Sequence, residues 1–142
     1  MKISAGILIV LRNEKVLLCH PTNSNWNSTY SPPKGIVNGG ERIIDAAIRE
    51  TFEETSIVIS ENMISNKSPI EIDYVKSGKV YKKVYLYRVD ISSIDEIGIE
   101  SEVIDKRLLQ IDEIDWAGFL NKSESTSKIF KRLEGVLDTL WK

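Results

Sequence analysis

The feature that most constrains this chain is a mixed acidic and apolar segment between Gly35 and Ile57, with the sequence GIVNGGERIIDAAIRETFEETSI. Apolar residues recur at intervals of three or four positions from Ile43 to Thr55, and no proline interrupts them. That spacing is typical of an amphipathic helix with one buried face. The segment therefore predicts a helix packed against the rest of the protein, preceded by a glycine-rich loop in which tight turns are possible.

The opposite face of this expected helix carries Glu50, Glu53 and Glu54 at spacings of three and four residues. Side chains at those spacings are neighbours on a helix, and adjacent like charges are unfavourable without a cation among them. Mg²⁺ is the expected cation, with Mn²⁺ as an alternative, because hard divalent ions take carboxylate oxygens and retain positions for water and phosphate. The competing interpretation is an acidic face that is only solvated.

The frame around the glutamates favours the metal site. Gly35 is followed after five residues by Glu41, and after seven more by the run RETFEETSI, which starts at Arg49. This frame resembles the Nudix box, glycine–x5–glutamate–x7–Arg-Glu-apolar-x-Glu-Glu-x-Gly-apolar, with every charged position present. Thr51 stands at an apolar position of the box. Ser56 stands where the box has a helix-ending glycine, so the end of the helix is expected to be altered without loss of a ligand.

The resemblance implies an α/β protein, a Nudix-type α/β/α sandwich with a mixed β-sheet between helices, formed as one domain by residues 1–142. It also implies a metal-dependent pyrophosphohydrolase, in which the metal neutralises a diphosphate link and activates water. Its metal ligands would be Gly35 through the carbonyl, Glu50, Glu53, Glu54 and Glu102. The general base would be Glu53 or Glu102, and the residues that orient the carboxylates would be Arg49 and Glu41.

Residues on either side of the box point to a substrate branch. The lead-in Pro33-Lys34-Gly35 and the position of Tyr74, seventeen residues after Ile57, are similar to the dinucleoside polyphosphate branch of the family. The hypothesis is therefore hydrolysis of a dinucleoside polyphosphate such as diadenosine tetraphosphate. Lysines would contact phosphates and aromatic rings would line a base or ribose pocket, and the candidate residues are Lys34, Tyr74, Lys83, Tyr85 and Trp26.

Several other activities stay open. Other members of the family hydrolyse ADP-ribose, nucleoside triphosphates, diphosphoinositols or RNA 5′ caps. The ADP-ribose branch tends to show a proline fifteen residues after the box, where this chain has Ile72. A non-catalytic nucleotide-binding regulator is a further alternative, which the presence of all the box glutamates disfavours.

Charge and cysteine content restrict the partners. A net charge of −2 lacks the basic character that duplex binding needs, and no apolar run approaches transmembrane length. The single cysteine, Cys19, excludes an internal disulfide framework and agrees with a reducing compartment. These properties indicate a cytoplasmic monomer or homodimer that binds a small-molecule nucleotide and neither duplex nucleic acid nor a membrane.

Periodicity and turn residues outside the box predict the remaining elements. Strands are expected at 3–11, 15–20, 70–76, 79–89 and 103–111, with a short additional strand at 57–60. Helices are expected at 112–120 and 125–141. Within the strand at 79–89, alternation places Lys83 and Tyr85 on one face.

Overall fold

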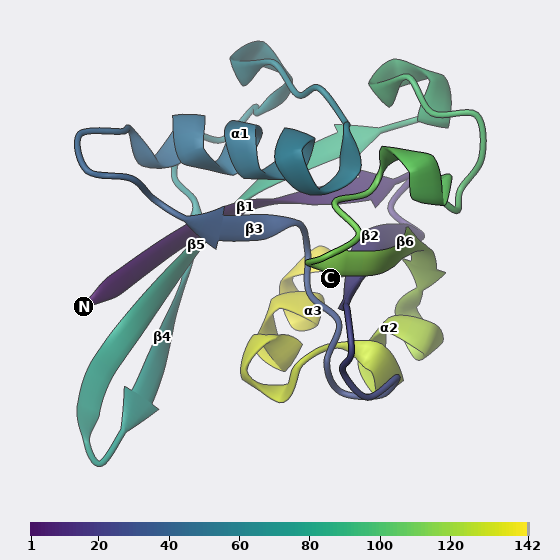
Figure 1. Ribbon diagram of the computed structural model, residues 1–142. Coiled ribbons are helices and arrows are strands. Elements are labelled where there is room, and N and C mark those ends of the chain that lie inside the picture. Colours follow the sequence, from purple (N-terminus) through teal and green to yellow (C-terminus); the bar gives the residue numbers. More distant parts are fainter. Residues whose placement is uncertain (142) are drawn as a thin grey trace.

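A mixed β-sheet forms the centre of the computed structural model, which describes residues 1–141 (Figure 1). Its strand order is β4-β5-β1-β2-β6, and β3 pairs with β1 beside this path. The β1–β5 pair is parallel and the other pairs are antiparallel. The strands are β1 (Lys2–Leu11), β2 (Lys15–Pro21), β3 (Lys34–Ile36), β4 (Ile70–Lys76), β5 (Lys79–Ile91) and β6 (Ile114–Asn121).

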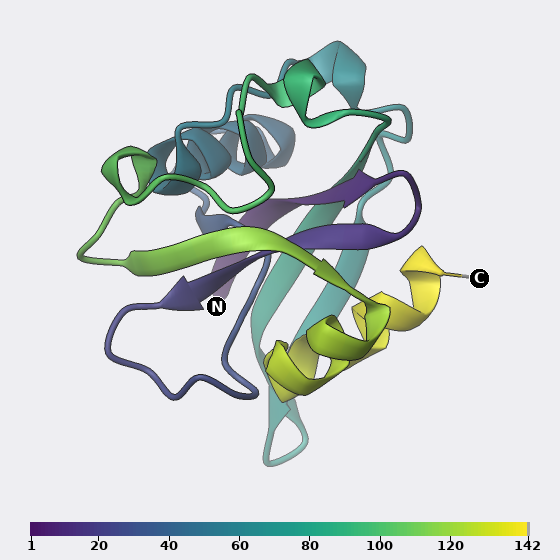
Figure 2. The same ribbon diagram turned by 90° about the vertical axis from the view of Figure 1, so that its right-hand side faces the viewer.

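Helices cover both faces of the sheet, as the two views show (Figures 1 and 2). The α1 helix (Ile43–Thr55) lies on one face, and α2 (Lys122–Lys128) and α3 (Glu134–Leu140) lie on the other. Short 3-10 turns occupy Glu61–Met63, Ile94–Ile97, Lys106–Leu108 and Lys131–Leu133. The expected α/β/α sandwich is therefore confirmed.

Two apolar clusters hold the layers together, one on each face of the sheet. The cluster under α1 includes Ile7, Ile9 and Leu17, whereas the cluster under α2 and α3 includes Leu8 and Val10. Because β1 lies between both clusters, its residues are buried on both faces, and this explains its nearly continuous apolar sequence. None of the helices within residues 1–141 is long and apolar enough to span a membrane.

The strands expected at 3–11, 15–20, 70–76 and 79–89 are confirmed, but the later elements differ. Residues 112–120 were expected to be helical, but 114–120 belong to β6 and 112–113 lie in the turn before it. Residues 103–111, expected to be a strand, form irregular chain around a 3-10 turn. In β6, Ala117 and Phe119 join one apolar cluster while Trp116 and Leu120 pack against the other. A strand buried on both faces has no alternating pattern, so periodicity cannot separate it from a buried helix.

The helix expected at 125–141 is divided into α2 and α3. At the break, Ile129 bridges to Tyr30, and the Phe130 N–H donates to the Tyr30 carbonyl over 2.8 Å. These contacts with the chain before β3 take the place of continued helical hydrogen bonds. Residues 57–60 are not assigned to a strand.

Candidate active site

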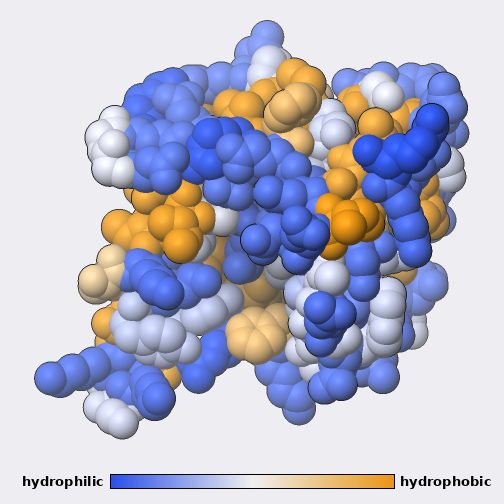
Figure 3. Space-filling model, viewed as in Figure 1, coloured by the Kyte–Doolittle hydropathy of each residue, from blue (hydrophilic) through white to orange (hydrophobic). Residues whose placement is uncertain are grey.

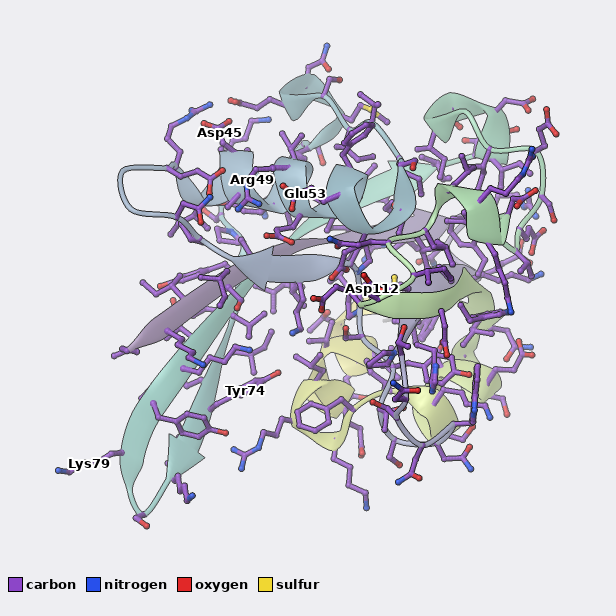
Figure 4. The ribbon with its side chains drawn as sticks, in the orientation of Figure 1. Asp45, Arg49, Glu53, Tyr74, Lys79 and Asp112 are labelled. Atoms are coloured by element: carbon purple, nitrogen blue, oxygen red, sulfur yellow. The ribbon has the colours of Figure 1, made fainter. Side chains whose placement is uncertain are left out.

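The α1 helix carries Glu50 and Glu54 on the side that meets β3, and Figure 4 shows Arg49 and Glu53 on the same helix. Its buried face carries Ile44, Ala46 and Ala47. At its end, Ser56 adopts the left-handed conformation, with φ 65°, that a glycine would favour. The Ser56 hydroxyl donates to the Leu108 carbonyl over 2.6 Å. This tertiary hydrogen bond offsets the backbone cost of serine and preserves the helix end that the box normally forms with glycine.

Arg49 connects the acidic side chains to the preceding loop. Its Nε and Nη2 donate to the two Glu41 carboxylate oxygens over 2.8 and 3.0 Å, a bidentate pair. Its Nη1 donates to Glu50 over 2.8 Å and to Glu53 over 3.1 Å, and Nη2 also reaches the Ile36 carbonyl over 3.0 Å. These bonds raise the pKa of Arg49 and lower that of Glu41. Arg49 therefore contacts Glu41, Glu50 and Glu53 at the same time.

Gly35 lies where β3 passes beneath α1. A Cβ on Gly35 would overlap the carboxylate of Glu50, so glycine is needed for this close approach. The neighbouring Lys34 N–H donates to the Glu54 carboxylate over 3.2 Å. The short strand β3 is therefore in contact with two of the three box glutamates.

Glu54 lies in an electrostatically unusual environment. Burial raises its pKa to about 8, the charges of Glu50 and Glu113 add to the increase, and the N–H and charge of Lys34 oppose it. A desolvated carboxylate next to other carboxylates is stabilised by a cation. Strongly shifted carboxylates of this kind are typical of functional sites.

The donor set suits a hard divalent cation. Glu50, Glu53 and Glu54 supply carboxylate oxygens, the ligands that magnesium and manganese prefer, and Gly35 adds a nearby backbone carbonyl. Within residues 1–141, no three acidic, histidine or cysteine side chains are gathered closely enough to form a complete metal site. In this arrangement Arg49 neutralises part of the charge that a cation would neutralise.

The structure does not bring Glu102 to these glutamates. Its carboxylate accepts a hydrogen bond from Lys15 Nζ over 2.7 Å. Glu54 lies instead near Cys19, where its charge adds to burial in raising the pKa of that thiol. Lys15 and Cys19 are four residues apart on one strand, roughly 13 Å at about 3.3 Å per residue.

A different acidic pair lies near the box and was missed because its segment was expected to be helical. Figure 4 shows Asp112 just before β6, below the C-terminal half of α1. The neighbouring Glu113 adds negative charge at Glu54. The Gln110 N–H donates to the Glu54 carbonyl over 3.1 Å and ties this segment to α1.

The position of Glu102 leads to a first prediction. Glu102→Gln should leave kcat and KM within about threefold of wild type, because the Glu102 carboxylate binds Lys15 and not the box. The free energy of unfolding should also change little, since a partly exposed pair such as Lys15–Glu102 contributes at most about 1 kcal/mol to stability. Steady-state kinetics and thermal unfolding would check both quantities. A loss of kcat by about a hundredfold with an unchanged melting temperature would restore Glu102 as the general base.

Lys34 lies between the box and the face of the sheet that carries Tyr74. Burial lowers the pKa of Lys34, and the charges of Glu54 and Glu50 oppose this decrease. Burial also lowers the pKa of Lys82, to about 8, and the charges of Lys34 and Lys2 add to this decrease. Figure 4 shows Tyr74 on the projecting β4–β5 hairpin, on the opposite side of the sheet from Glu53.

An open groove of about 560 Å³ runs beside Tyr74 and is lined by Met1, Lys2, Tyr74, Tyr81 and Lys82. Figure 3 shows the surface hollowed between this hairpin and the C-terminal helices. Lys82 Nζ and Arg132 Cζ lie 5.3 and 5.6 Å from the Tyr74 ring centre. Within residues 1–141, Lys2 and Lys82 form no ion pair with a carboxylate, so their charges are available to attract an anion.

Lys83 and Tyr85 lie elsewhere. Glu71 and Asp73 bind Lys83 Nζ over 2.6 and 3.3 Å. In the strand alternation, Lys83 and Tyr85 face the α1 side, whereas Tyr74 lies directly opposite Lys82. The structure therefore brings together Tyr74, Lys34 and Lys82, and it does not bring Lys83 and Tyr85 into this groove.

Trp26 lies in the loop between β2 and β3. Its ring stacks on His20, with centres 3.5 Å apart, and it remains 51% exposed. The loop is attached to the segment before β6, because the Thr22 N–H donates to the Glu113 carbonyl over 3.0 Å. Trp26 is therefore an exposed aromatic ring on a loop that is attached to the segment carrying Glu113.

The arrangement of a mixed sheet between helices is shared with solved structures. The chain superposes with a TM-score of 0.68 on a C. elegans Ap4A hydrolase binary complex, at 22% identity over 97% of this chain and 93% of that one. It superposes with a TM-score of 0.65 on a MutT protein from Methanosarcina mazei Go1, at 17% identity over 98% and 91% of the two chains. At these identities the likeness shows the fold.

The family follows from the sequence itself. Residues 2–133 match the model of the NUDIX domain, and the chain belongs to the Nudix family. It is also similar to the rat bis(5′-nucleosyl)-tetraphosphatase [asymmetrical], with 35% identity over 85 residues, 59% of this chain and 57% of the rat protein. The mouse protein of the same name is 39% identical over 56 residues, 39% of this chain and 38% of that protein. The matched stretches thus span only about half, or less, of these relatives.

Proposed function

We propose that this chain is a metal-dependent Nudix pyrophosphohydrolase that cleaves dinucleoside polyphosphates such as diadenosine tetraphosphate. The observation that carries the proposal is the position of Lys34. Its N–H contacts the acidic site at Glu54, and its charge reaches the basic and aromatic groove at Lys82. A substrate with a long phosphate chain between two nucleosides fits a site in which carboxylates and free lysines are adjacent. The names of the rat and mouse relatives support the same substrate class.

The acidic side of the site would hold the divalent cation. Glu50, Glu53, Glu54 and the Gly35 carbonyl are the proposed ligands, with Mg²⁺ as the expected ion and Mn²⁺ as an alternative. When bound, such an ion neutralises phosphate charge and makes water a better nucleophile. Asp112 and Glu113 add negative charge at the same place.

The protein side chains have separate tasks in the reaction. Glu53, half-exposed and oriented by Arg49, accepts the proton of the attacking water. Glu41 fixes the guanidinium through its bidentate pair. Lys34 and Lys82 attract the phosphate chain. The Lys82 ammonium group lies over the Tyr74 ring, and this cation–π contact holds it in place.

A substrate panel tests the proposal. Diadenosine tetraphosphate, ADP-ribose, nucleoside triphosphates, a diphosphoinositol and a capped RNA are compared with and without Mg²⁺, with products identified by chromatography. The expected result is metal-dependent turnover with the highest kcat/KM for the dinucleoside polyphosphate. Far faster turnover of ADP-ribose or a triphosphate would reject the substrate assignment, and no turnover of any compound would favour a nucleotide-binding regulator.

Adjacent lysines on opposite faces of β5 provide a second prediction. Lys82→Met should raise KM for diadenosine tetraphosphate about tenfold or more, because a charge-assisted contact contributes about 1.5–3 kcal/mol. In the wild type, KM should also rise above about pH 8, as Lys82 loses its proton and its charge. Steady-state kinetics from pH 6.5 to 9 would measure both effects.

Lys83→Met is the matched control, since Glu71 and Asp73 already bind Lys83 on the other face. Its KM should stay within about twofold of wild type. Equal effects of the two substitutions on KM, or a larger effect of Lys83→Met, would show that the groove beside Lys82 does not bind the substrate.

A further inference from the structure

His20, the only histidine of the chain, is almost fully buried at the end of β2, with 1% of its surface exposed. Acceptors contact both of its ring nitrogens. Nδ1 lies 2.5 Å from a carboxylate oxygen of Asp115, and Nε2 lies 3.1 and 2.9 Å from the carbonyl oxygens of Ser24 and Asn25. Carbonyl oxygens only accept, so Nε2 carries a proton. Polar groups therefore hold the ring at both nitrogens, Asp115 at Nδ1 and the two backbone carbonyls at Nε2.

The His20 ring packs against Trp26. The two rings are nearly parallel, 4° apart, with centres 3.5 Å apart. The Tyr30 ring lies at the edge of the stack, 5.1 Å from His20 and 6.3 Å from Trp26. Stacking on His20 therefore covers one face of Trp26, while the rest of the indole stays in solvent.

The backbone on both sides of Trp26 is also fixed. His20 Nε2 binds the carbonyls of the two residues before it, Ser24 and Asn25. Lys128 Nζ, from α2, donates to the Trp26 carbonyl and to the Asn27 side chain over 3.0 Å each. The charged groups that face the cluster are thus Asp115 from β6 and Lys128 from α2. An exposed aromatic ring held by this many contacts is preorganised to stack on a planar ligand.

We propose that His20, held by Asp115 and two backbone carbonyls, is a positioning residue that fixes Trp26 as a stacking platform for one base of the nucleotide substrate. This inference rests on the proposed function and adds to it the residues that recognise a base. The platform is linked to the acidic site by two contacts: Thr22 binds the Glu113 carbonyl, and Gln110 binds the Glu54 carbonyl. A base on Trp26 and phosphates at the carboxylates would therefore lie within one elongated site.

Binding measurements test the platform without needing turnover. Calorimetric titrations with diadenosine tetraphosphate, adenosine monophosphate and inorganic tripolyphosphate, each with Mg²⁺, are compared for wild type, Trp26→Ala, Trp26→Phe and His20→Phe. Trp26→Ala should weaken both nucleotides about tenfold and leave tripolyphosphate unchanged, since stacking acts only on a base. Trp26→Phe should recover most of the affinity. His20→Phe, which keeps a ring but has no N–H, should weaken the nucleotides severalfold and raise KM more than it lowers kcat.

The outcomes separate this inference from the proposed function. If nucleotides bind in a Trp26-dependent manner but no dinucleoside polyphosphate is hydrolysed, the proposed function fails and the platform stands. If hydrolysis occurs and Trp26→Ala binds nucleotides as tightly as wild type, the platform is overturned. An equal loss of affinity for tripolyphosphate would also overturn it, because that loss would reflect general disruption of the loop. Thermal unfolding identifies any variant that does not fold. If Trp26→Ala does not fold, the nucleotide affinities of Trp26→Phe and wild type are compared instead.

Discussion

Glu54→Gln should lower kcat for diadenosine tetraphosphate by about a thousandfold while the protein remains folded. The substitution keeps the size of the side chain and removes a proposed metal ligand, and the metal is expected to contribute several kcal/mol of transition-state stabilisation. Each 1.36 kcal/mol corresponds to a factor of ten in rate. Steady-state kinetics over a range of Mg²⁺ concentrations would measure the loss. Glu14→Gln, in the exposed turn between β1 and β2, is the control and should retain wild-type activity.

The same substitution should stabilise the metal-free protein. The folded pKa of Glu54, about 8, lies above its ordinary value of 4.5. The folded state therefore binds this proton more tightly than the unfolded state, so the contribution of Glu54 to stability is present below about pH 4.5 and is lost as pH rises through 8. At pH 8 the ionised carboxylate costs on the order of a few kcal/mol, and glutamine removes that cost.

Thermal unfolding without metal, followed from pH 5 to 8.5, would show this effect. The wild-type melting temperature should fall relative to that of Glu54→Gln as pH rises. Added Mg²⁺ should raise the wild-type melting temperature most at the alkaline end, because a metal binds the deprotonated ligand. Parallel pH curves for the two proteins, together with retained activity in the variant, would contradict the assignment of Glu54.

Gly35→Ala should also inactivate the enzyme, by about a hundredfold or more, although it removes no functional group. The new methyl group would overlap the Glu50 carboxylate, so either β3 or Glu50 must move, and a misplaced ligand disturbs the catalytic arrangement. Measurements of kcat and of Mg²⁺ affinity would both register the change.

Gly135→Ala is the matched control for Gly35→Ala. Gly135 lies within α3, and a Cβ there would meet no atom within 4 Å. Alanine should stabilise this helix by about 0.5–1 kcal/mol and leave activity unchanged. Near-normal activity in Gly35→Ala would show that the contact between β3 and Glu50 has no role in catalysis.

The box helix was predictable because all of its constraints are local. Apolar spacing defines its buried face, the glutamate spacing defines the other, and Arg49 reaches Glu50 and Glu53 within one turn of the same helix. The first two strands and the hairpin were likewise indicated by short runs and tight turns. The prediction was wrong at β6, where burial on both faces removes the alternation that marks a strand.

The substrate groove depends on a detail of strand pairing that no local pattern shows. A register shift between Tyr74 and Val75 places Tyr74 opposite Lys82, whereas the turn alone would pair it with Tyr81. A shift of one residue moves a side chain to the other face of a sheet. Sequence reasoning selected Lys83 because it shares a face with Tyr85 in the alternation of the strand. The structure instead places Lys82 opposite Tyr74.

The contacts of His20 are long-range in the same sense. Asp115 is 95 residues away in sequence, and the two meet only because β2 pairs with β6. A lone histidine at the end of a strand gives no indication of such a partner. Trp26 was a candidate from its residue type alone, and its support by His20 required the structure.

The central claim is that Glu50, Glu53 and Glu54 hold a divalent cation for hydrolysis of a diphosphate link. Crystals soaked in manganese test it most directly, because anomalous diffraction locates the ion without reference to activity. The account predicts a manganese peak within about 2–2.5 Å of oxygens from these carboxylates. Well-ordered crystals in which all three carboxylates face bulk solvent, with no peak between them, would contradict it.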